Sequence, residues 1–150
     1  MNKFVRFLPI ADAFAAMSKY PRTKVGALVL GPRFEVRSTG WNGAPRGSRA
    51  DEDDRLSDRD TALTWTAHAE ANAIANAASS GARLEGCTLV VTHMPCMACA
   101  KLIVQSGIVQ IVTRRPDAEF SARWGSDVSN ALRLFSEVGV RLVLGPQQAA

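Results

Sequence analysis

The sequence shows little of the patterns that are typical of disulfide frameworks, membrane-spanning segments or secretion signals. Three cysteines in 150 residues are few and odd in number, which argues against a disulfide framework and for reduced thiols or a metal site. Apolar runs such as 27–30 fall far short of the ~20 residues that a bilayer-spanning helix needs. Asp12 interrupts the basic N-terminal stretch and no small-residue cleavage site follows, so we expect no signal peptide. These absences predict a cytoplasmic protein that does not contact membranes.

The composition is that of an ordinary globular protein. Hydrophobic residues make up 47% and charged residues 21%, and a chain of 150 residues can bury an apolar core, so we expect one domain over 1–150. The net charge is 18 − 14 = +4, and fourteen of the 18 basic residues are arginine. Arginine suits bidentate recognition of phosphate, which is compatible with a phosphorylated small-molecule substrate. Because no basic block marks a nucleic-acid track, we do not expect nucleic acid as a partner.

Alternating helix and strand patterns predict an α/β fold. Apolar residues at helical spacing, ended by proline or glycine, predict helices over 5–17, 68–79, 96–106 and 128–138. Short apolar runs predict strands over 25–30, 34–38, 88–92, 108–113 and 140–144, the first two forming a hairpin. Residues 40–65 are predicted to form a long charged loop, of a kind that is usually functional or mobile. This order predicts a mixed five-stranded sheet with helices on both faces.

Two motifs place metal-binding side chains at the starts of two predicted helices. Cys96 and Cys99 are three residues apart and share a helix face, so they can bind one tetrahedral metal. His68 adds a third ligand, and three protein ligands leave the open position that is typical of catalytic zinc. A closed structural site would need a fourth ligand, for which Cys87 and His93 are the candidates. The cysteine pair alone would also fit a redox dithiol or half of a structural site.

Glu70 adds a proton carrier beside this metal site. It follows His68 by two residues and is not needed as a ligand. Zinc lowers the pKa of a bound water toward ~7, and hydrolytic loss of an amine then needs protons moved from the water to the substrate and to ammonia. One carboxyl group can carry out both transfers. The pattern H-x-E together with P-C-x-x-C is the signature of zinc-dependent nucleobase deaminases.

The sequence resembles the cytidine and deoxycytidylate (dCMP) deaminase superfamily over 10–143, and its dCMP deaminase branch in particular. The matching segments are Pro-Arg-Thr-Lys-Val-Gly-Ala at 21–27, Gly-Trp-Asn-Gly-Ala-Pro at 40–45, His-Ala-Glu-Ala-Asn-Ala-Ile at 68–74, Pro-Cys-Met-Ala-Cys-Ala-Lys-Leu-Ile at 95–103 and Gln-Ser-Gly-Ile at 105–108. The resemblance implies a three-layer α/β/α fold of the cytidine deaminase type. It also implies hydrolysis of dCMP, or of a closely related 5-substituted nucleotide, to dUMP and ammonia.

The resemblance implies one catalytic zinc held by His68, Cys96 and Cys99, with Glu70 moving the protons. Some relatives hold a second, structural zinc in the long loop, but residues 43–67 contain neither cysteine nor histidine, so we expect one zinc only. Relatives assemble as homo-oligomers, and part of the branch binds a nucleoside triphosphate effector. The resemblance therefore also predicts a homo-oligomer and raises an effector as a further partner.

Several substrate contacts are carried over by the same resemblance. Asn42 is expected to contact the sugar and Arg22 the 5′-phosphate, since an amide suits hydroxyl groups and a guanidinium suits phosphate. Ala69 is expected beside the base, and Trp41 either packs in the core or stacks on the base, with packing favoured.

The phosphate region departs from the family pattern. The tyrosine that some relatives place near the phosphate after the fourth strand is absent, because Tyr20 is the only tyrosine in the chain. Arg115 and Trp124 are the candidates to replace it, with Arg114 and Arg123 in the same region.

Two other functions stay open at this point. A tRNA adenosine deaminase shares Gly40-Trp41-Asn42, but six acidic residues between Asp51 and Asp60 would repel a phosphate backbone that faced them. A zinc-stabilised binding module without turnover would have no need of Glu70. Replacing Glu70 with alanine therefore distinguishes an enzyme from such a module.

Overall fold

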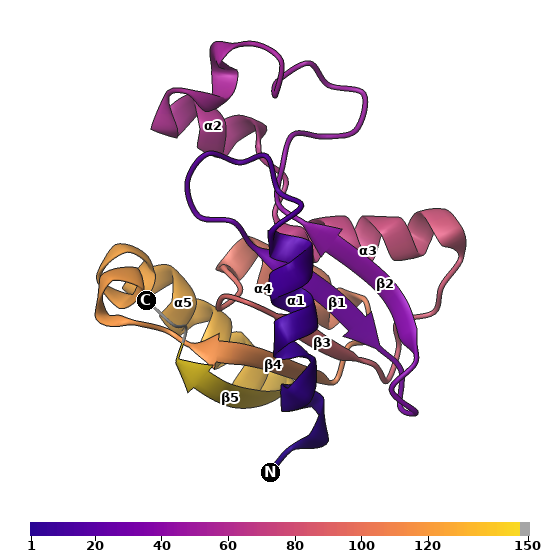
Figure 1. The fold of residues 1–150 in the computed structure, drawn as a ribbon. Helices are drawn as coiled ribbons and strands as arrows, with labels where there is room; N and C mark the ends of the chain where they lie inside the picture. The colour runs from indigo at the N-terminus through magenta and orange to yellow at the C-terminus, as the bar shows by residue number, and fades with distance from the viewer. Residues whose placement is uncertain (148–150) are drawn as a thin grey trace.

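A mixed five-stranded sheet forms the centre of the computed structural model, which describes residues 1–147 (Figure 1). The strand order is β2-β1-β3-β4-β5; β1 runs antiparallel to β2 and β3, and β3, β4 and β5 are parallel. The strands are β1 (Gly26–Leu30), β2 (Val36–Trp41), β3 (Thr88–Val91), β4 (Gln110–Arg115) and β5 (Arg141–Gln147). The predicted hairpin and mixed five-stranded sheet are confirmed.

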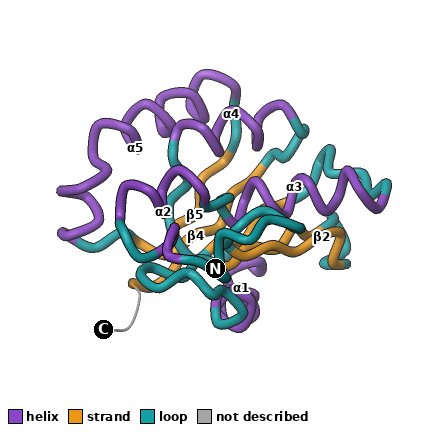
Figure 2. The backbone as a smooth tube through the Cα atoms, turned by 90° about the horizontal axis from the view of Figure 1, so that it is seen from above, coloured by secondary structure: helices purple, strands orange, loops and turns teal. Residues whose placement is uncertain are grey.

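Helices cover both faces of the sheet, so the predicted three-layer α/β/α arrangement is also confirmed. One helix layer consists of α3 (Ala69–Ser80), α4 (Met97–Gln105) and α5 (Ala118–Val138), and the other of α1 (Leu8–Ala15), which continues a 3-10 turn, η1 (Lys3–Phe7). Figure 2 shows α3, α4 and α5 on one side of the strands and α1 on the other. No helix within residues 1–147 is both long enough and apolar enough to span a bilayer.

The strands divide the apolar core into two parts. In β1, Ala27 and Val29 pack into the cluster beneath α3, α4 and α5, while Leu28 and Leu30 pack into the cluster beneath α1. Successive side chains of a strand point to opposite faces, so a strand covered on both faces is apolar at every position. This explains why β1 lacks the polar alternation of β2, whose outer residues are exposed.

Two glycines bring helices unusually close to the sheet. A Cβ atom at Gly26 would lie 2.1 Å from the Ala11 carbonyl oxygen in α1. A Cβ atom at Gly40 would lie 2.4 Å from the Ala69 carbonyl oxygen and 2.5 Å from the Ala73 nitrogen, both in α3. Any side chain at either position would push the helix off the sheet. The first turn of α3 is therefore held in place by the absence of a side chain on β2.

The predicted loop 40–65 is partly ordered into secondary structure. After β2 the chain forms a short 3-10 helix, η2 (Asp54–Leu56), and then α2 (Arg59–Trp65), which stand beyond one end of the sheet (Figure 1). A backbone bridge between Gly43 and Ala67 closes the base of this 43–67 segment. A small apolar cluster joins Leu56 and Ala62 of this segment to Tyr20, which precedes β1. The prediction of an irregular loop was therefore wrong for α2, because its helix is stabilised by packing on Tyr20 rather than by an apolar stripe.

Three predicted boundaries also differ from the structure. The last helix begins at Ala118 rather than at residue 128, because Asp117 caps it by accepting a hydrogen bond from the Phe120 nitrogen (2.7 Å). The second strand runs over Val36–Trp41 rather than 34–38, since the turn extends to Phe34, which has a φ of 66°. The opening α-helix ends at Ala15 and starts only after η1.

Candidate active site

The two sequence motifs meet at the beginnings of α3 and α4. His68 is the N-cap residue of α3 and Cys96 is the N-cap residue of α4, with Cys99 one turn further along. The His68 Nδ1 atom lies 3.4 Å from Cys96 Sγ and 3.5 Å from Cys99 Sγ. Tetrahedral zinc with bonds of about 2.0–2.1 Å to nitrogen and about 2.3 Å to sulfur places such atoms roughly 3.6 Å apart. The three side chains therefore fit a single zinc ion.

The two candidates for a fourth ligand, Cys87 and His93, are not grouped with the three ligand atoms. The His93 ring hydrogen-bonds through Nδ1 to the Thr92 hydroxyl (2.9 Å), and burial lowers the pKa of His93, so the ring is neutral. The Cys87 thiol lies near the Arg83 and Glu85 carbonyl oxygens, at 3.7 and 3.9 Å. Within residues 1–147, only His68, Cys96 and Cys99 bring three ligand atoms within 4.8 Å of one another. The zinc site is thus of the three-ligand, open kind.

The ligand side chains share protons through hydrogen bonds. The largest effect on Cys96 is the hydrogen bond from Cys99, which together with a bond from His68 lowers the pKa of Cys96 to about 4. The pKa of the Cys99 thiol is raised by the hydrogen bond that Cys99 makes to Cys96 and by burial. The hydrogen bond to Cys96 also raises the pKa of His68. These shifts favour the thiolate form of Cys96, and a zinc ion would bind deprotonated thiols and a neutral imidazole.

Glu70 lies in the first turn of α3, next to the ligand atoms. Its side chain is 4% exposed, and burial raises its pKa to about 7. A carboxyl group with such a pKa is partly protonated at neutral pH, so it can both donate and accept a proton there. This is the property that a proton carrier beside a metal needs.

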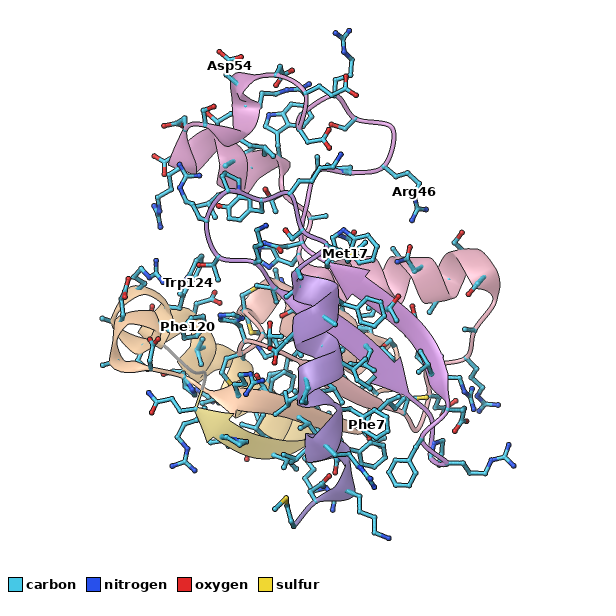
Figure 3. All side chains as sticks on the ribbon, viewed as in Figure 1. Phe7, Met17, Arg46, Asp54, Phe120 and Trp124 are labelled. Atoms are coloured by element: carbon cyan, nitrogen blue, oxygen red, sulfur yellow. The ribbon has the colours of Figure 1, made fainter. Side chains whose placement is uncertain are left out.

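A cavity of about 140 Å³ opens beside the ligands. Its lining includes His68, Ala69, Glu70 and Cys96 from the two motifs. The other lining residues are Tyr20, Arg22, Thr23, Val25, Asn42, Arg59, Leu63, Thr66, His93, Met94, Phe120, Arg123, Trp124 and Val128. Its three arginines come from three places, namely the segment before β1, α2 and α5. Phe120 and Trp124 lie on the first turns of α5 (Figure 3). The cavity thus combines apolar walls with guanidinium groups.

Asn42 and Arg22 both line this cavity, and both also hold the chain around it. The Asn42 side chain accepts a hydrogen bond from the Val25 nitrogen (2.8 Å) and donates to the Thr23 carbonyl (2.9 Å). Arg22 donates to the Leu56 and Ser57 carbonyl oxygens (3.3 and 2.9 Å). Arg22 therefore connects the segment before β1 to the end of η2, and its position at the cavity depends on the 43–67 segment.

Of the other residues predicted to contact the substrate, some line the cavity and some do not. Ala69 and Trp124 line the cavity. Trp41 is not part of its lining; its ring stacks on Phe14, with centroids 6.4 Å apart. Arg115 lines a neighbouring hollow with Arg114 and Arg123. Arg114 is ion-paired with Asp12.

Sequence reasoning missed Arg59, Leu63 and Phe120 as cavity residues. Arg59 and Leu63 belong to α2, which was predicted as loop, and Phe120 belongs to the early part of α5. Capping signals could have found both helices. The Asp58 carboxylate accepts from the Thr61 nitrogen (2.9 Å), as Asp117 does from Phe120, and Asp is among the preferred N-cap residues.

Comparison with known proteins agrees with this site. Residues 1–114 match the family model described as the cytidine and deoxycytidylate deaminase zinc-binding region. An uncharacterized deaminase of Aliivibrio fischeri is 37% identical over 143 residues, covering 94% of this chain and 92% of that protein. A deoxycytidylate deaminase of Mycobacterium phage D29 is 41% identical over 117 residues, covering 71% of this chain and 89% of that protein.

A solved structure and a longer relative complete the comparison. The dCMP deaminase of cyanophage S-TIM5, solved with dCMP and dUMP, superposes with a TM-score of 0.75 at 26% identity and covers 96% of this chain and 98% of that one. The human deoxycytidylate deaminase is 36% identical over 71% of this chain, which spans only 61% of the human protein. The chain therefore belongs to the zinc-binding family of cytidine and deoxycytidylate deaminases.

Proposed function

We propose that the protein is a zinc-dependent dCMP deaminase, which converts dCMP and water to dUMP and ammonia. The observation that carries the proposal is the buried Glu70 beside three zinc ligands in an arginine-lined cavity. Zinc on His68, Cys96 and Cys99 supplies a Lewis acid that lowers the pKa of water toward about 7. The phage D29 relative is named a deoxycytidylate deaminase, and the cyanophage dCMP deaminase was solved in complex with dCMP and dUMP.

Glu70 performs the proton transfers in this proposal. With its pKa raised to about 7, the carboxylate takes a proton from the attacking water and passes it to the ring nitrogen beside the amine. It then takes the second proton of the same water from the new hydroxyl group and delivers it to the amino group, which leaves as ammonia. Ala69 is the first residue of α3, so its backbone N–H has no acceptor within the helix and can bind the ring carbonyl of the base.

The arginines favour a nucleoside monophosphate over an uncharged nucleoside. Arg22, Arg59 and Arg123 line the cavity. A guanidinium binds phosphate through two parallel hydrogen bonds. We place the 5′-phosphate near Arg22 and the sugar near Asn42, while Trp124 and Arg115 stay predicted contacts of the nucleotide.

Exposed carboxylates on the 43–67 segment disfavour tRNA as the substrate. The segment whose residues Arg59, Leu63 and Thr66 line the cavity carries six acidic residues: Asp51, Glu52, Asp53, Asp54, Asp58 and Asp60. Four of them form ion pairs, with Lys19, Arg49, Arg55 and Arg59, which leaves Asp54 and Asp58 without an ion pair among the described residues. A nucleic acid approaching this opening would place its phosphates near these negative charges. A single small nucleotide avoids most of that repulsion.

The remaining expectations extend the same proposal. We propose that the protein acts in the cytoplasm, because a reducing compartment keeps the ligand thiols free to bind zinc. The homo-oligomer and the nucleoside triphosphate effector stay predictions.

The test is ammonia release by the purified zinc-loaded protein from dCMP, deoxycytidine and a tRNA anticodon hairpin. We expect turnover of dCMP, weaker turnover of deoxycytidine and none of the hairpin. Glu70→Gln is expected to keep zinc while kcat falls by about 10²–10⁴-fold, the range for loss of a general acid–base. Glu137→Gln, on the exposed side of α5, is the control and should match the wild type. Turnover of the hairpin alone, or full activity of Glu70→Gln, would contradict the proposal.

A further inference from the structure

A carboxylate from α5 binds the chain between the two cysteine ligands. The Asp127 Oδ2 atom accepts a hydrogen bond from the Met97 backbone nitrogen at 2.7 Å. This distance is at the short end of the range for N–H···O bonds, as expected for a charged acceptor. The first four N–H groups of a helix lack intrahelical partners, and Met97 is the first residue of α4. Asp127 therefore caps α4 from another helix.

The bonded nitrogen belongs to the peptide that joins Cys96 to Met97. Cys96 has φ −72° and ψ 169°, an extended conformation that turns its thiol back toward the Cys99 nitrogen (3.5 Å). Rotation about ψ of Cys96 would swing this peptide and tilt the start of α4 relative to the thiol. A bond that holds the Met97 nitrogen opposes that rotation. It therefore fixes the direction in which the Cys96 sulfur points.

Asp127 lies on the same face of α5 as the cavity residues. Phe120, Arg123, Trp124 and Val128 line the cavity and are spaced three or four residues apart, which places them on one side of a helix. Asp127 follows Arg123 by four residues and Trp124 by three, so it belongs to that side. One helix thus both forms a cavity wall and contacts the zinc motif. The family match ends at residue 114 and does not include this helix.

We propose that Asp127 is a positioning residue of the zinc site, which orients the Cys96 thiolate by holding the Cys96–Met97 peptide from α5. Among the described residues, it belongs neither to the ligand group nor to the cavity lining. Groups that hold metal ligands in this way typically change metal affinity about 10- to 100-fold when they are removed. The inference depends on the zinc site and is independent of which nucleotide the cavity accepts.

The test measures zinc affinity and the geometry of the site without any turnover. Asp127→Ala is expected to raise the zinc dissociation constant about 10- to 100-fold in competition with a chromogenic chelator. With cobalt(II) in place of zinc, the thiolate-to-metal absorption bands should shift or weaken in this variant. The control is Asp58→Ala, which removes a similar carboxylate cap from α2 (2.9 Å to the Thr61 nitrogen) but does not contact the zinc motif. We expect its zinc affinity and cobalt spectrum to match the wild type.

A second variant keeps the test decisive if Asp127→Ala fails to fold. Asp127→Asn retains an acceptor oxygen without the charge, so we expect zinc binding within about threefold of the wild type and an upfield shift of the Met97 amide proton. An unchanged Met97 amide proton in Asp127→Asn would overturn the inference. So would wild-type zinc affinity in Asp127→Ala, or equal losses in Asp127→Ala and Asp58→Ala. Because these readouts need no substrate, a failure of dCMP turnover leaves their interpretation unaffected.

Discussion

Replacing Gly40 in β2 with alanine should disturb the zinc site, because the added Cβ would displace α3, which begins beside the zinc ligand His68. The added Cβ would lie 2.4 Å from the Ala69 carbonyl oxygen and 2.5 Å from the Ala73 nitrogen. Ordinary contacts start near 3.4 Å, so α3 must move by about 1 Å away from β2. Overpacking of this kind costs about 1–3 kcal/mol. For a chain of this length that lowers the melting temperature by about 3–10 °C.

The same movement should reduce catalysis. His68 and Glu70 lie at the start of α3, beside the atoms that the new Cβ would touch. A misplacement of about 1 Å can lower activity about 10²-fold. We therefore expect Gly40→Ala to lose zinc affinity and kcat as well as stability, measured by calorimetry, chelator competition and ammonia release.

Two other glycines provide matched controls. A Cβ at Gly26 would lie 2.1 Å from the Ala11 carbonyl, so Gly26→Ala should lose similar stability by displacing α1, which carries no zinc ligand. It should keep its zinc affinity. A Cβ at Gly43 meets no atom within 4 Å, so Gly43→Ala should change neither quantity. If Gly40→Ala melts and binds zinc like Gly43→Ala, the close approach of α3 to β2 does not position the site.

The remaining predictions concern the metal and the phosphate. Zinc at 100 times its dissociation constant stabilises the fold by about 2.7 kcal/mol, so removing it with a chelator should lower the melting temperature by about 8 °C. An unchanged calorimetric transition would show that zinc does not bind the folded chain. Arg22→Ala should raise KM for dCMP about 10- to 100-fold, since hydrogen bonds to charged groups contribute about 1.5–3 kcal/mol, and should change KM for deoxycytidine less than threefold. Equal increases for both substrates would mean that Arg22 only holds Leu56 and Ser57.

Local patterns were sufficient to predict the sheet and the cysteine pair of the metal site. Strands β1 and β3 are short, largely apolar runs, and β1 is apolar at every position because both of its faces are covered. Cys96 and Cys99 are neighbours on one helix by spacing alone, whatever the rest of the fold does. His68 could be added only through the combined signature, because nothing local places α3 beside α4.

Features that depend on distant contacts could not be predicted. The Asp58 cap marks the start of α2, but the helix has one buried residue, Ala62, and its packing on Tyr20 has no local signal. The Asn42 amide bonds the backbone at Thr23 and Val25, nineteen and seventeen residues away along the chain, which its expected contact with the sugar did not include. The bond from Asp127 to Met97 joins residues 30 positions apart. Such pairings follow from the assembled fold and leave no periodic signal.

The meeting of two helix starts at the zinc site has an electrical consequence for the cavity. His68 and Cys96 are the N-cap residues of α3 and α4, so the amino ends of both helices face the same space. Each amino end behaves as roughly half a positive elementary charge. Together they favour negative charge where the Cys96 thiol and Glu70 lie. The backbone itself therefore favours the deprotonated thiol that zinc needs, while the arginine side chains attract an anionic substrate.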